Sequence, residues 1–296
     1  MTVSRRLAAI ALGAGVARLA YRELNRRQPG GPDTWTRKNH RGEPVTLLEG
    51  PALVAGTAGA IALAPGLPPR LRTAAMLAAL SAGALGSYDD LAGSGSSRGL
   101  RGHFDALAKG EVTTGAVKLL GIGAAGLVAG ALVQRKPLDK LLAGIVIAGS
   151  ANLVNLLDLR PGRAIKAGLM AGTPVMLARS GSASAAGSRG RGPRGRGPRG
   201  RGAGVLAAGS MGAAAALLPE DLSERAMLGD AGANALGAAL GVAAAAGSGR
   251  GGLLLRAASI IGLTLASEKV SFTKVIAASP PLNAIDMLGR RPVSTE

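Results

Sequence analysis

The stretch that decides the fold is TAAMLAALSAGALGSYDD, residues 73 to 90, in which an apolar run ends on two adjacent acids. The run from Thr73 to Gly86 carries no charge, which is typical of a helix in apolar surroundings. Asp89 and Asp90 follow where it stops. Neighbouring carboxylates repel one another unless a cation neutralises them. The pair is therefore a candidate metal site, and the alternative is a helix end whose acids face water.

The composition extends this apolar character to the whole chain. The 296 residues are 47% hydrophobic and include 47 Gly, yet only 2% are aromatic, and the formal net charge is +18. Soluble globular chains are seldom so rich in small apolar residues. The absence of cysteine excludes disulfides and thiolate metal sites. The composition thus favours a membrane protein.

Nine apolar segments are predicted to form membrane-crossing helices. A segment of about 16 to 18 apolar residues rises roughly 25 Å as a helix, just enough to cross a bilayer core. The first follows Arg5 and Arg6 and has no small-residue cleavage site after it, so we interpret it as a retained helix and not as a signal peptide. Abundant Gly and Ala favour close helix packing. The segments are residues 7–20, 51–65, 71–86, 114–133, 138–156, 164–178, 205–218, 231–247 and 253–267.

The predicted fold class is therefore all-α: a polytopic integral membrane helix bundle of about nine transmembrane helices, with one domain over residues 1–296. Residues 180–204 repeat Arg, Gly and Pro and are predicted to be a disordered insert. Counting helices places this insert outside the cell. A passive linker is the first interpretation of it, and binding to anionic lipid or to a wall polymer is the second.

Alternating crossings assign every polar loop to one of two sides. One side receives 16 of the 17 acids, both histidines and all five aromatic residues, and only Asp139 among the acids falls opposite. Longer loops on that side explain part of this bias, but an active site at one membrane face explains the nearly empty opposite side. Without Arg179 and the six arginines of the insert, Lys and Arg divide 19 to 9 in favour of the acid-bearing side, which the positive-inside rule makes cytoplasmic.

Three acidic motifs on this side form a series along the chain. The Asp89–Asp90 pair comes first, Asn152-Leu-Val-Asn155-Leu-Leu-Asp158 second, and Gly229-Asp230-Ala-Gly third. Asn152, Asn155 and Asp158 are spaced three apart and so share a helix face. Carboxylates with Arg and Lys nearby suit a Mg²⁺ ion that bridges to a diphosphate, because this ion takes one or two carboxylates and completes its shell with phosphate oxygens and water.

The order and spacing of these motifs resemble the polyprenyl-phosphate N-acetylhexosamine-1-phosphate transferase family, over most of the chain outside the insert. The resemblance implies an enzyme, a phosphoglycosyl transferase of cell-envelope glycopolymer biosynthesis in the plasma membrane. It would transfer a sugar-1-phosphate from a UDP-sugar to polyprenyl phosphate and release UMP, with Mg²⁺ as cofactor and Mn²⁺ as an alternative. Its partners would be these two substrates and the bilayer, with no nucleic acid; a homodimer is compatible with this scheme.

The resemblance also implies roles for individual residues. The catalytic acids would be Asp89, Asp90, Asp158 and Asp230, and the metal ligands Asp90, Asp158 and Asp230. We expect the Asp pair to position the lipid phosphate and not to remove a proton, because phosphate monoesters are already largely ionised near neutral pH. The expected substrate-binding residues are Asn39, Arg98, Arg101, His103, Lys118, Asn152, Asn155, Arg160 and Arg163.

The sequence departs from the family pattern at several positions. Pro161 stands where the family has a second acid associated with the nucleotide, and Arg160 and Arg163 are expected to grip phosphates instead, because guanidinium groups match their oxygens. Ala233 replaces a usual serine, and the last loop lacks a histidine cluster. A noncatalytic relative that binds lipid-linked precursors or a partner protein is therefore an alternative. A transporter is less favoured, because its ionisable groups would lie near mid-membrane.

Overall fold

A computed structural model describes residues 2–93, 110, 112–178 and 200–292. It is all-α apart from one small sheet, as predicted, and each of the nine predicted apolar segments forms a helix. Most observed helices begin one or more residues before the predicted segment, because polar residues join their first turns. The long helices are α1 (Thr2–Arg27), α3 (Glu49–Leu63), α4 (Pro69–Ala92), α6 (Thr114–Val133), α7 (Pro137–Leu157), α8 (Arg163–Leu177), α9 (Ala203–Leu222), α10 (Gly229–Gly247) and α11 (Arg250–Ser267).

Three of the described helices, α6, α7 and α9, are long and apolar enough to cross a membrane, and α3 is a shorter apolar helix. This agrees with a chain that associates with a membrane. The sequence predicts nine membrane crossings, but the lengths and hydropathies of the described helices support only these three. Several of the other helices carry charged ends or hold fewer apolar residues than a span requires.

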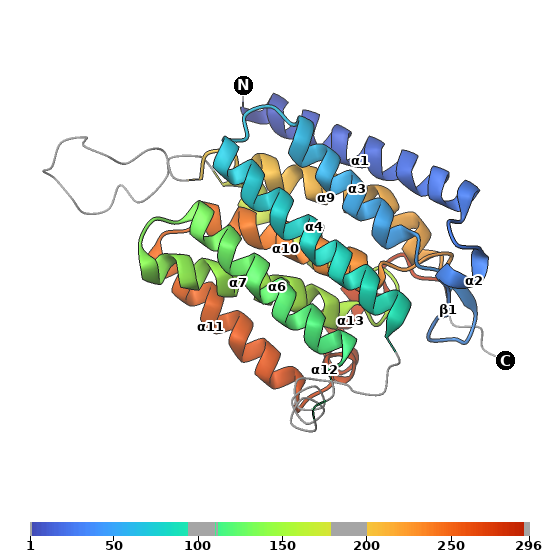
Figure 1. Ribbon diagram of the computed structural model, residues 1–296. Coiled ribbons are helices and arrows are strands. Elements are labelled where there is room, and N and C mark those ends of the chain that lie inside the picture. Colours follow the sequence, from blue (N-terminus) through green and yellow to red (C-terminus); the bar gives the residue numbers. More distant parts are fainter. Residues whose placement is uncertain (1, 94–109, 111, 179–199, 293–296) are drawn as a thin grey trace, which may run out of the picture.

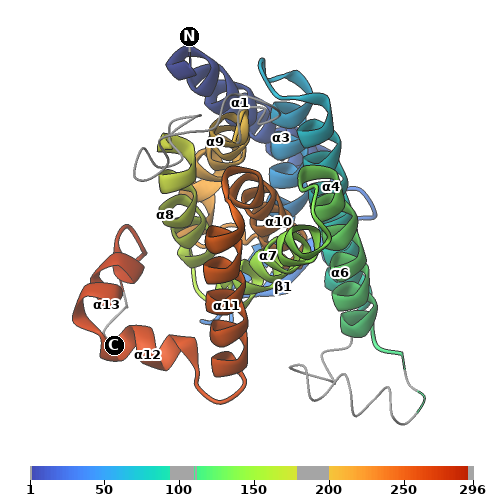
Figure 2. The same cartoon turned by 90° about the vertical axis from the view of Figure 1, so that its left-hand side faces the viewer.

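The helix α10 lies at the centre of the bundle. It packs against α3, α4, α6, α7, α8 and α9, and its residues from Ala231 to Ala245 are buried. In Figures 1 and 2 it runs between the other long helices, with α1 at one edge of the bundle. Small residues permit this close packing. A Cβ atom at Gly86 of α4 would overlap the backbone oxygen of Asp230, and one at Gly237 would overlap that of Ser150.

The connections divide between the two ends of the bundle. At one end, which we call the site end, α4, α7 and α9 finish and α3, α6, α8 and α10 begin. At the opposite end, Arg250 forms an ion pair with Asp139 (Nε to Oδ1, 2.6 Å), and Gln134 donates to the backbone oxygen of Ala245 at 2.7 Å. The last residues of the insert predicted to be disordered, residues 180–204, are ordered: Ala203 and Gly204 form the buried first turn of α9. Residues 179–199 lie outside the described residues.

The site end carries short elements that the nine apolar segments do not include. The helix α2 (Pro32–Trp35) leads into strands β1 (Thr36–Lys38) and β2 (Pro44–Thr46), which pair antiparallel with Thr36 opposite Thr46. The indole Nε1 of Trp35 donates to the backbone oxygen of Pro29 at 2.6 Å. Thr46 also forms a bridge with Ala226, so the hairpin is held against the segment before α10.

Two further helices follow α11 at the site end. They are α12 (Phe272–Ala278) and α13 (Pro280–Met287), and they extend sideways from the bundle (Figure 2). The chain then returns towards the hairpin, where Arg291 forms an ion pair with Glu43 (Nη1 to Oε2, 2.7 Å). The C-terminal segment thus contributes to the same end of the bundle as the three acidic motifs.

Candidate functional site

The carboxylate of Asp90 caps the start of α10. Its Oδ1 accepts a hydrogen bond from the backbone N–H of Asp230 at 3.0 Å, and its Oδ2 accepts one from Ala231 at 2.9 Å. The residue before the helix, Leu228, supplies no side-chain cap. Asp90 therefore satisfies free N–H groups of the first turn and places a negative charge at the positive end of the helix. This contact joins the first and third acidic motifs directly.

The neighbouring acid, Asp89, faces a different partner. Lys118 Nζ donates to Asp89 Oδ2 at 2.5 Å and also to Asp230 Oδ2, so one ammonium joins both carboxylates. Thr114 Oγ1 donates to the other oxygen of Asp89 at 2.5 Å. Lys118, predicted to bind substrate, is thus a counter-ion for two of these acids. We call Asp89, Asp90, Asp158 and Asp230 the acidic cluster.

Asp158 completes the convergence of the three motifs. It caps the end of α7, accepts a hydrogen bond from the backbone N–H of Gly229, and lies within electrostatic range of Asp90 and Asp230. Its second oxygen, Oδ2, is buried without a hydrogen-bond partner among the described residues. Burial, followed by the charges of Asp221 and the two other acids, raises the pKa of Asp158 well above its ordinary value.

The sequence predicts that Asp89, Asp90 and Asp230 lie in loops, but in the structure they lie at the ends of helices. Asp89 and Asp90 belong to the last turn of α4, and Asp230 to the first turn of α10. The helices therefore position the carboxylates through their own backbones, which is a more rigid arrangement than loops would give.

Two further buried acids lie beside this cluster. Glu49 at the start of α3 is 0% exposed, and neither of its carboxylate oxygens has a partner in the described structure. Asp221 near the end of α9 is 2% exposed; it accepts from the backbone N–H of Gly162, and its Oδ2 has no partner there. In the sequence both acids lie just outside the predicted apolar segments 51–65 and 205–218, and the observed helices extend to include them. A buried acid at such a position is costly unless a ligand or ion meets it.

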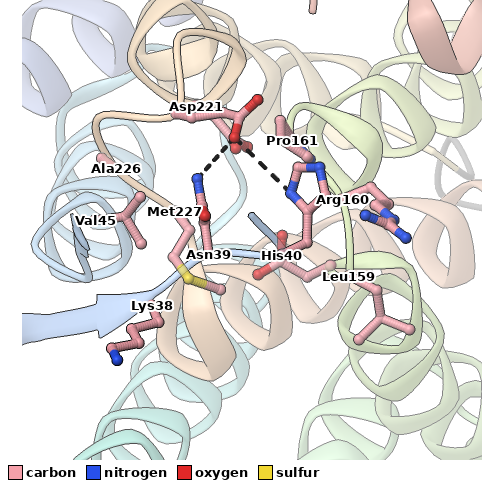
Figure 3. Close-up of a pocket in the computed structure, with 12 residues that line it drawn as sticks. Lys38, Asn39, His40, Val45, Leu159, Arg160, Pro161, Asp221, Ala226 and Met227 are labelled. Carbon is pink, nitrogen blue, oxygen red and sulfur yellow. Dashed lines mark hydrogen bonds and ion pairs between the residues drawn. The ribbon is translucent and has the colours of Figure 1, made fainter. Parts of the chain in front are cut away.

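A pocket of about 260 Å³ opens between the hairpin, the loop after α7 and the end of α9, and we call it the polar pocket because seven of its twelve lining residues are polar or charged. Asn39 and His40 both contact the carboxylate of Glu224. Figure 3 draws these two contacts as dashed lines from Asn39 and His40. The residues that line the pocket are Lys38, Asn39, His40, Val45, Asp158, Leu159, Arg160, Pro161, Asp221, Glu224, Ala226 and Met227. The pocket thus adjoins the acidic cluster through Asp158.

Asn39, predicted to bind substrate, uses its side chain within the protein. Its Nδ2 donates to Glu224 Oε2 at 2.7 Å, and its Oδ1 accepts from the backbone N–H groups of Arg41 and Glu43 at 2.8 and 2.9 Å. The amide shapes the turn between β1 and β2. Beside it, burial and then the charge of Arg160 lower the pKa of His40, which favours the neutral imidazole at pH 7.

The two predicted phosphate-binding arginines differ in availability. Arg163 is buried: its Nε and Nη2 contact Asp286 Oδ1 and Oδ2 at 2.8 and 3.0 Å, and its Nη1 donates to Thr273. Each guanidinium nitrogen thus helps to hold α12 or α13 against α8, and Arg163 does not line the polar pocket where a contact with phosphate was expected. Arg160 lines the polar pocket, and its guanidinium makes no hydrogen bond or ion pair with the described residues.

Two of the remaining predicted substrate contacts, Asn152 and Asn155, are not brought to the polar pocket. Asn152 and Asn155 lie in the last two turns of α7, line neither this pocket nor the apolar groove, and make no side-chain hydrogen bond with another described residue. Arg98, Arg101 and His103 lie outside the described residues.

An apolar groove of about 350 Å³ lies next to the polar pocket, between α7, α8, α11, α12 and α13. Leu157 lines the groove, and the next residue, Asp158, lines the polar pocket. Met170 and Phe272 also face the groove, where Lys166 is one of the few charged residues. A ligand with a long apolar chain and a charged head group would fit this pair of adjoining sites.

The acids suit a cation that needs few protein ligands. Nowhere in the described parts of the chain are three Asp, Glu or His side chains placed to hold one ion among themselves. Yet Asp158 Oδ2 is buried and unpartnered, and an ammonium already stands between Asp89 and Asp230. Mg²⁺ takes one or two carboxylates and completes its shell with phosphate and water. The donor set therefore fits Mg²⁺ with a phosphate ligand and does not fit an all-protein cage.

A scan against models of protein families finds no match for this chain, and a search of curated proteins finds no similar sequence.

Proposed function

We propose that this protein is an integral membrane transferase that moves a sugar-1-phosphate from a UDP-sugar to a polyprenyl phosphate. The observation that carries the proposal is the meeting of the three acidic motifs at the start of α10, with a polar pocket on one side and an apolar groove on the other. A reaction between a soluble nucleotide-sugar and a lipid phosphate needs this combination of surfaces at one place.

We further propose that the nine long helices cross the bilayer, with the site end in the cytoplasm of the cell. The support is the alternation of the helix ends, the near absence of acids from the opposite end, and the excess of Lys and Arg at the site end. The apolar side chains that α11 exposes, such as Leu255 at 70%, would then face lipid.

In this scheme the nucleotide-sugar occupies the polar pocket, where Arg160 and Lys38, neither of which pairs with an acid of the described residues, would meet its phosphates. The prenyl chain lies in the apolar groove, so that its phosphate reaches the acids beside Leu157. Asp158 and Asp230 would hold Mg²⁺. When bound, this ion neutralises phosphate charge that would otherwise repel the acids.

The reaction forms one P–O bond and breaks another. An oxygen of the lipid phosphate attacks the phosphorus that bears the sugar, and the bond from that phosphorus to the oxygen of the UMP group breaks. UMP leaves with the bonding electron pair, and the product is a lipid-linked sugar diphosphate. No proton must be removed from an ionised phosphate, so the acids act by alignment and Asp90 by fixing the start of α10.

The test is release of UMP by the purified full-length protein from a panel of UDP-sugars, with polyprenyl phosphate and Mg²⁺. We expect release from at least one donor, and its loss in the Asp230→Asn variant. Asp139→Asn, at the opposite end, is the matched control and should keep activity. If the protein is folded and binds polyprenyl phosphate but releases UMP from no donor, the proposed transferase activity is rejected.

A noncatalytic relative is the second candidate, and two observations favour it. Lys118 already neutralises Asp89 and Asp230, and Pro161 occupies the pocket wall where the family places an acid. Such a protein would bind a lipid-linked precursor without reacting. Full complementation of a deletion strain by the Asp89→Asn, Asp230→Asn double variant would favour this candidate over the transferase.

A further inference from the structure

The ammonium of Lys118 occupies the place between two carboxylates that a cation would need. It donates to Asp89 Oδ2 at 2.5 Å and to Asp230 Oδ2, and the three side chains are 12%, 16% and 27% exposed. Water therefore screens these charges only partly. The third acid nearby, Asp90, is engaged with backbone N–H groups of α10 and offers no replacement.

The start of α6 is built to place this ammonium. Thr114 and Lys118 are four residues apart and so share one face of the helix, and both donate to Asp89. One turn later, a Cβ at Gly121 would contact Leu85, so α6 and α4 pack closely there. The stem of Lys118 is flexible, however, and its charge is a single point that can move to another anion without moving the helix.

A divalent ion and the ammonium cannot share these oxygens. Two cations at the same carboxylates would lie within a few ångströms and repel strongly at a partly buried site. Binding of the ion must therefore displace Lys118 from at least one carboxylate. The released ammonium would lie beside the ion, where a phosphate ligand carries compensating charge.

We propose that Lys118 is an exchangeable internal counter-ion. It holds Asp89 and Asp230 in place in the cation-free protein, competes with the divalent ion for Asp230, and transfers to the phosphate of the bound substrate when the ion binds. The phosphate step rests on the proposed function, whereas the competition rests only on the contacts of Lys118.

The first experiment measures Mn²⁺ affinity by electron paramagnetic resonance on the full-length protein in detergent. Lys118→Met should bind Mn²⁺ about tenfold or more tightly than the wild type, because the competing charge is gone. Lys118→Arg should stay near the wild type, and Lys140→Met, at the opposite end, is the matched control. Unchanged or weaker binding by Lys118→Met, or no Mn²⁺ binding by any of these proteins, would overturn the proposal.

A second experiment uses only the wild type, so it remains decisive if Lys118→Met does not fold. The rate of acetylation of Lys118, followed by mass spectrometry of its peptide, should rise several-fold when Mn²⁺ saturates the protein and fall again on adding undecaprenyl phosphate. An unchanged rate with bound Mn²⁺ would reject the displacement. If the Mn²⁺ effects appear but no donor releases UMP, the exchange of Lys118 is supported and the proposed transferase activity is rejected.

Discussion

Arg163 and Asp286 form a buried two-point ion pair that joins the start of α8 to α13 across 123 residues of sequence. The side chains are only 6% and 7% exposed. Burial alone would raise the pKa of Asp286, but the hydrogen bonds and charge of Arg163, with the charge of Arg290, outweigh it and the net direction is down. The pair anchors α13, whose Leu282 and Ile285 form one wall of the apolar groove.

Removing one partner of this pair should destabilise the protein strongly. We expect Asp286→Ala to cost about 3–5 kcal/mol, because it leaves Arg163 buried and uncompensated. The Arg163→Met, Asp286→Leu double variant should recover only part of this loss, since it removes the charge of Arg163 but leaves Arg290, which also pairs with Asp286 and is 8% exposed. Thermal unfolding in detergent measures both. Equal losses in the single and double variants would mean that shape and not charge decides the contact.

The cap that Asp90 provides should be measurable as stability. Asp90→Ala removes the acceptor for the N–H groups of Asp230 and Ala231, and we expect a loss of about 0.5–2 kcal/mol in the free energy of unfolding. Asp33→Ala is the control, because Asp33 is exposed in α2 and should change stability by less than about 0.5 kcal/mol. A similar change in both variants would remove Asp90 from this role.

Asp158 should make the cation-free protein less stable as the pH rises. Its pKa in the folded chain lies above that in the unfolded chain, so the unfolded chain binds fewer protons between the two values and stability falls through this window. Asp158→Asn should therefore unfold at a higher temperature than the wild type at pH 7 with a chelator present. The advantage should shrink as the pH approaches about 4, the ordinary pKa of an aspartate.

The control for this pH effect is Asp139→Asn, which breaks an ion pair with Arg250 at the opposite end and should not stabilise the protein at pH 7. A wild type whose unfolding temperature does not depend on pH between 4 and 7 would contradict the interpretation of Asp158.

The contact of α4 with α10 depends on a missing side chain at Gly86. Because a Cβ there would overlap the backbone of Asp230, we expect Gly86→Ala to cost about 1–3 kcal/mol and to disturb the acidic cluster. Gly123→Ala is the matched control: Gly123 is also helical, and a Cβ there would meet nothing within 4 Å. Unfolding temperatures of the two variants should therefore differ clearly.

Hydrophobic patterning was sufficient to predict the helices and their grouping by ends. The apolar segments are long and separated by charged residues, so their number and approximate bounds follow from the sequence, and parity assigns their ends. The meeting of Asp90, Asp158 and Asp230 at one end was expected for the same reason. The sequence does not report how many of these helices lie in lipid.

Pairwise partners were less predictable, because they depend on distances between segments far apart in the chain. Arg163 was expected at phosphate because a guanidinium suits it, but its position at the start of α8 directs it to Asp286. Asn39 was expected to bind substrate, but its side-chain oxygen accepts hydrogen bonds from the backbone of the tight turn between β1 and β2. Glu49 and Asp221 lie outside the predicted apolar segments, and their burial follows only from the packing of the bundle.

The position of Trp35 has a practical consequence. It is the only tryptophan in the sequence, it immediately precedes β1, and its backbone oxygen accepts from Leu47 at 2.8 Å. Intrinsic fluorescence excited at the red edge of protein absorption therefore comes from one known location beside the hairpin. Titrating ligands against this emission monitors that region optically, without any dye or engineered label.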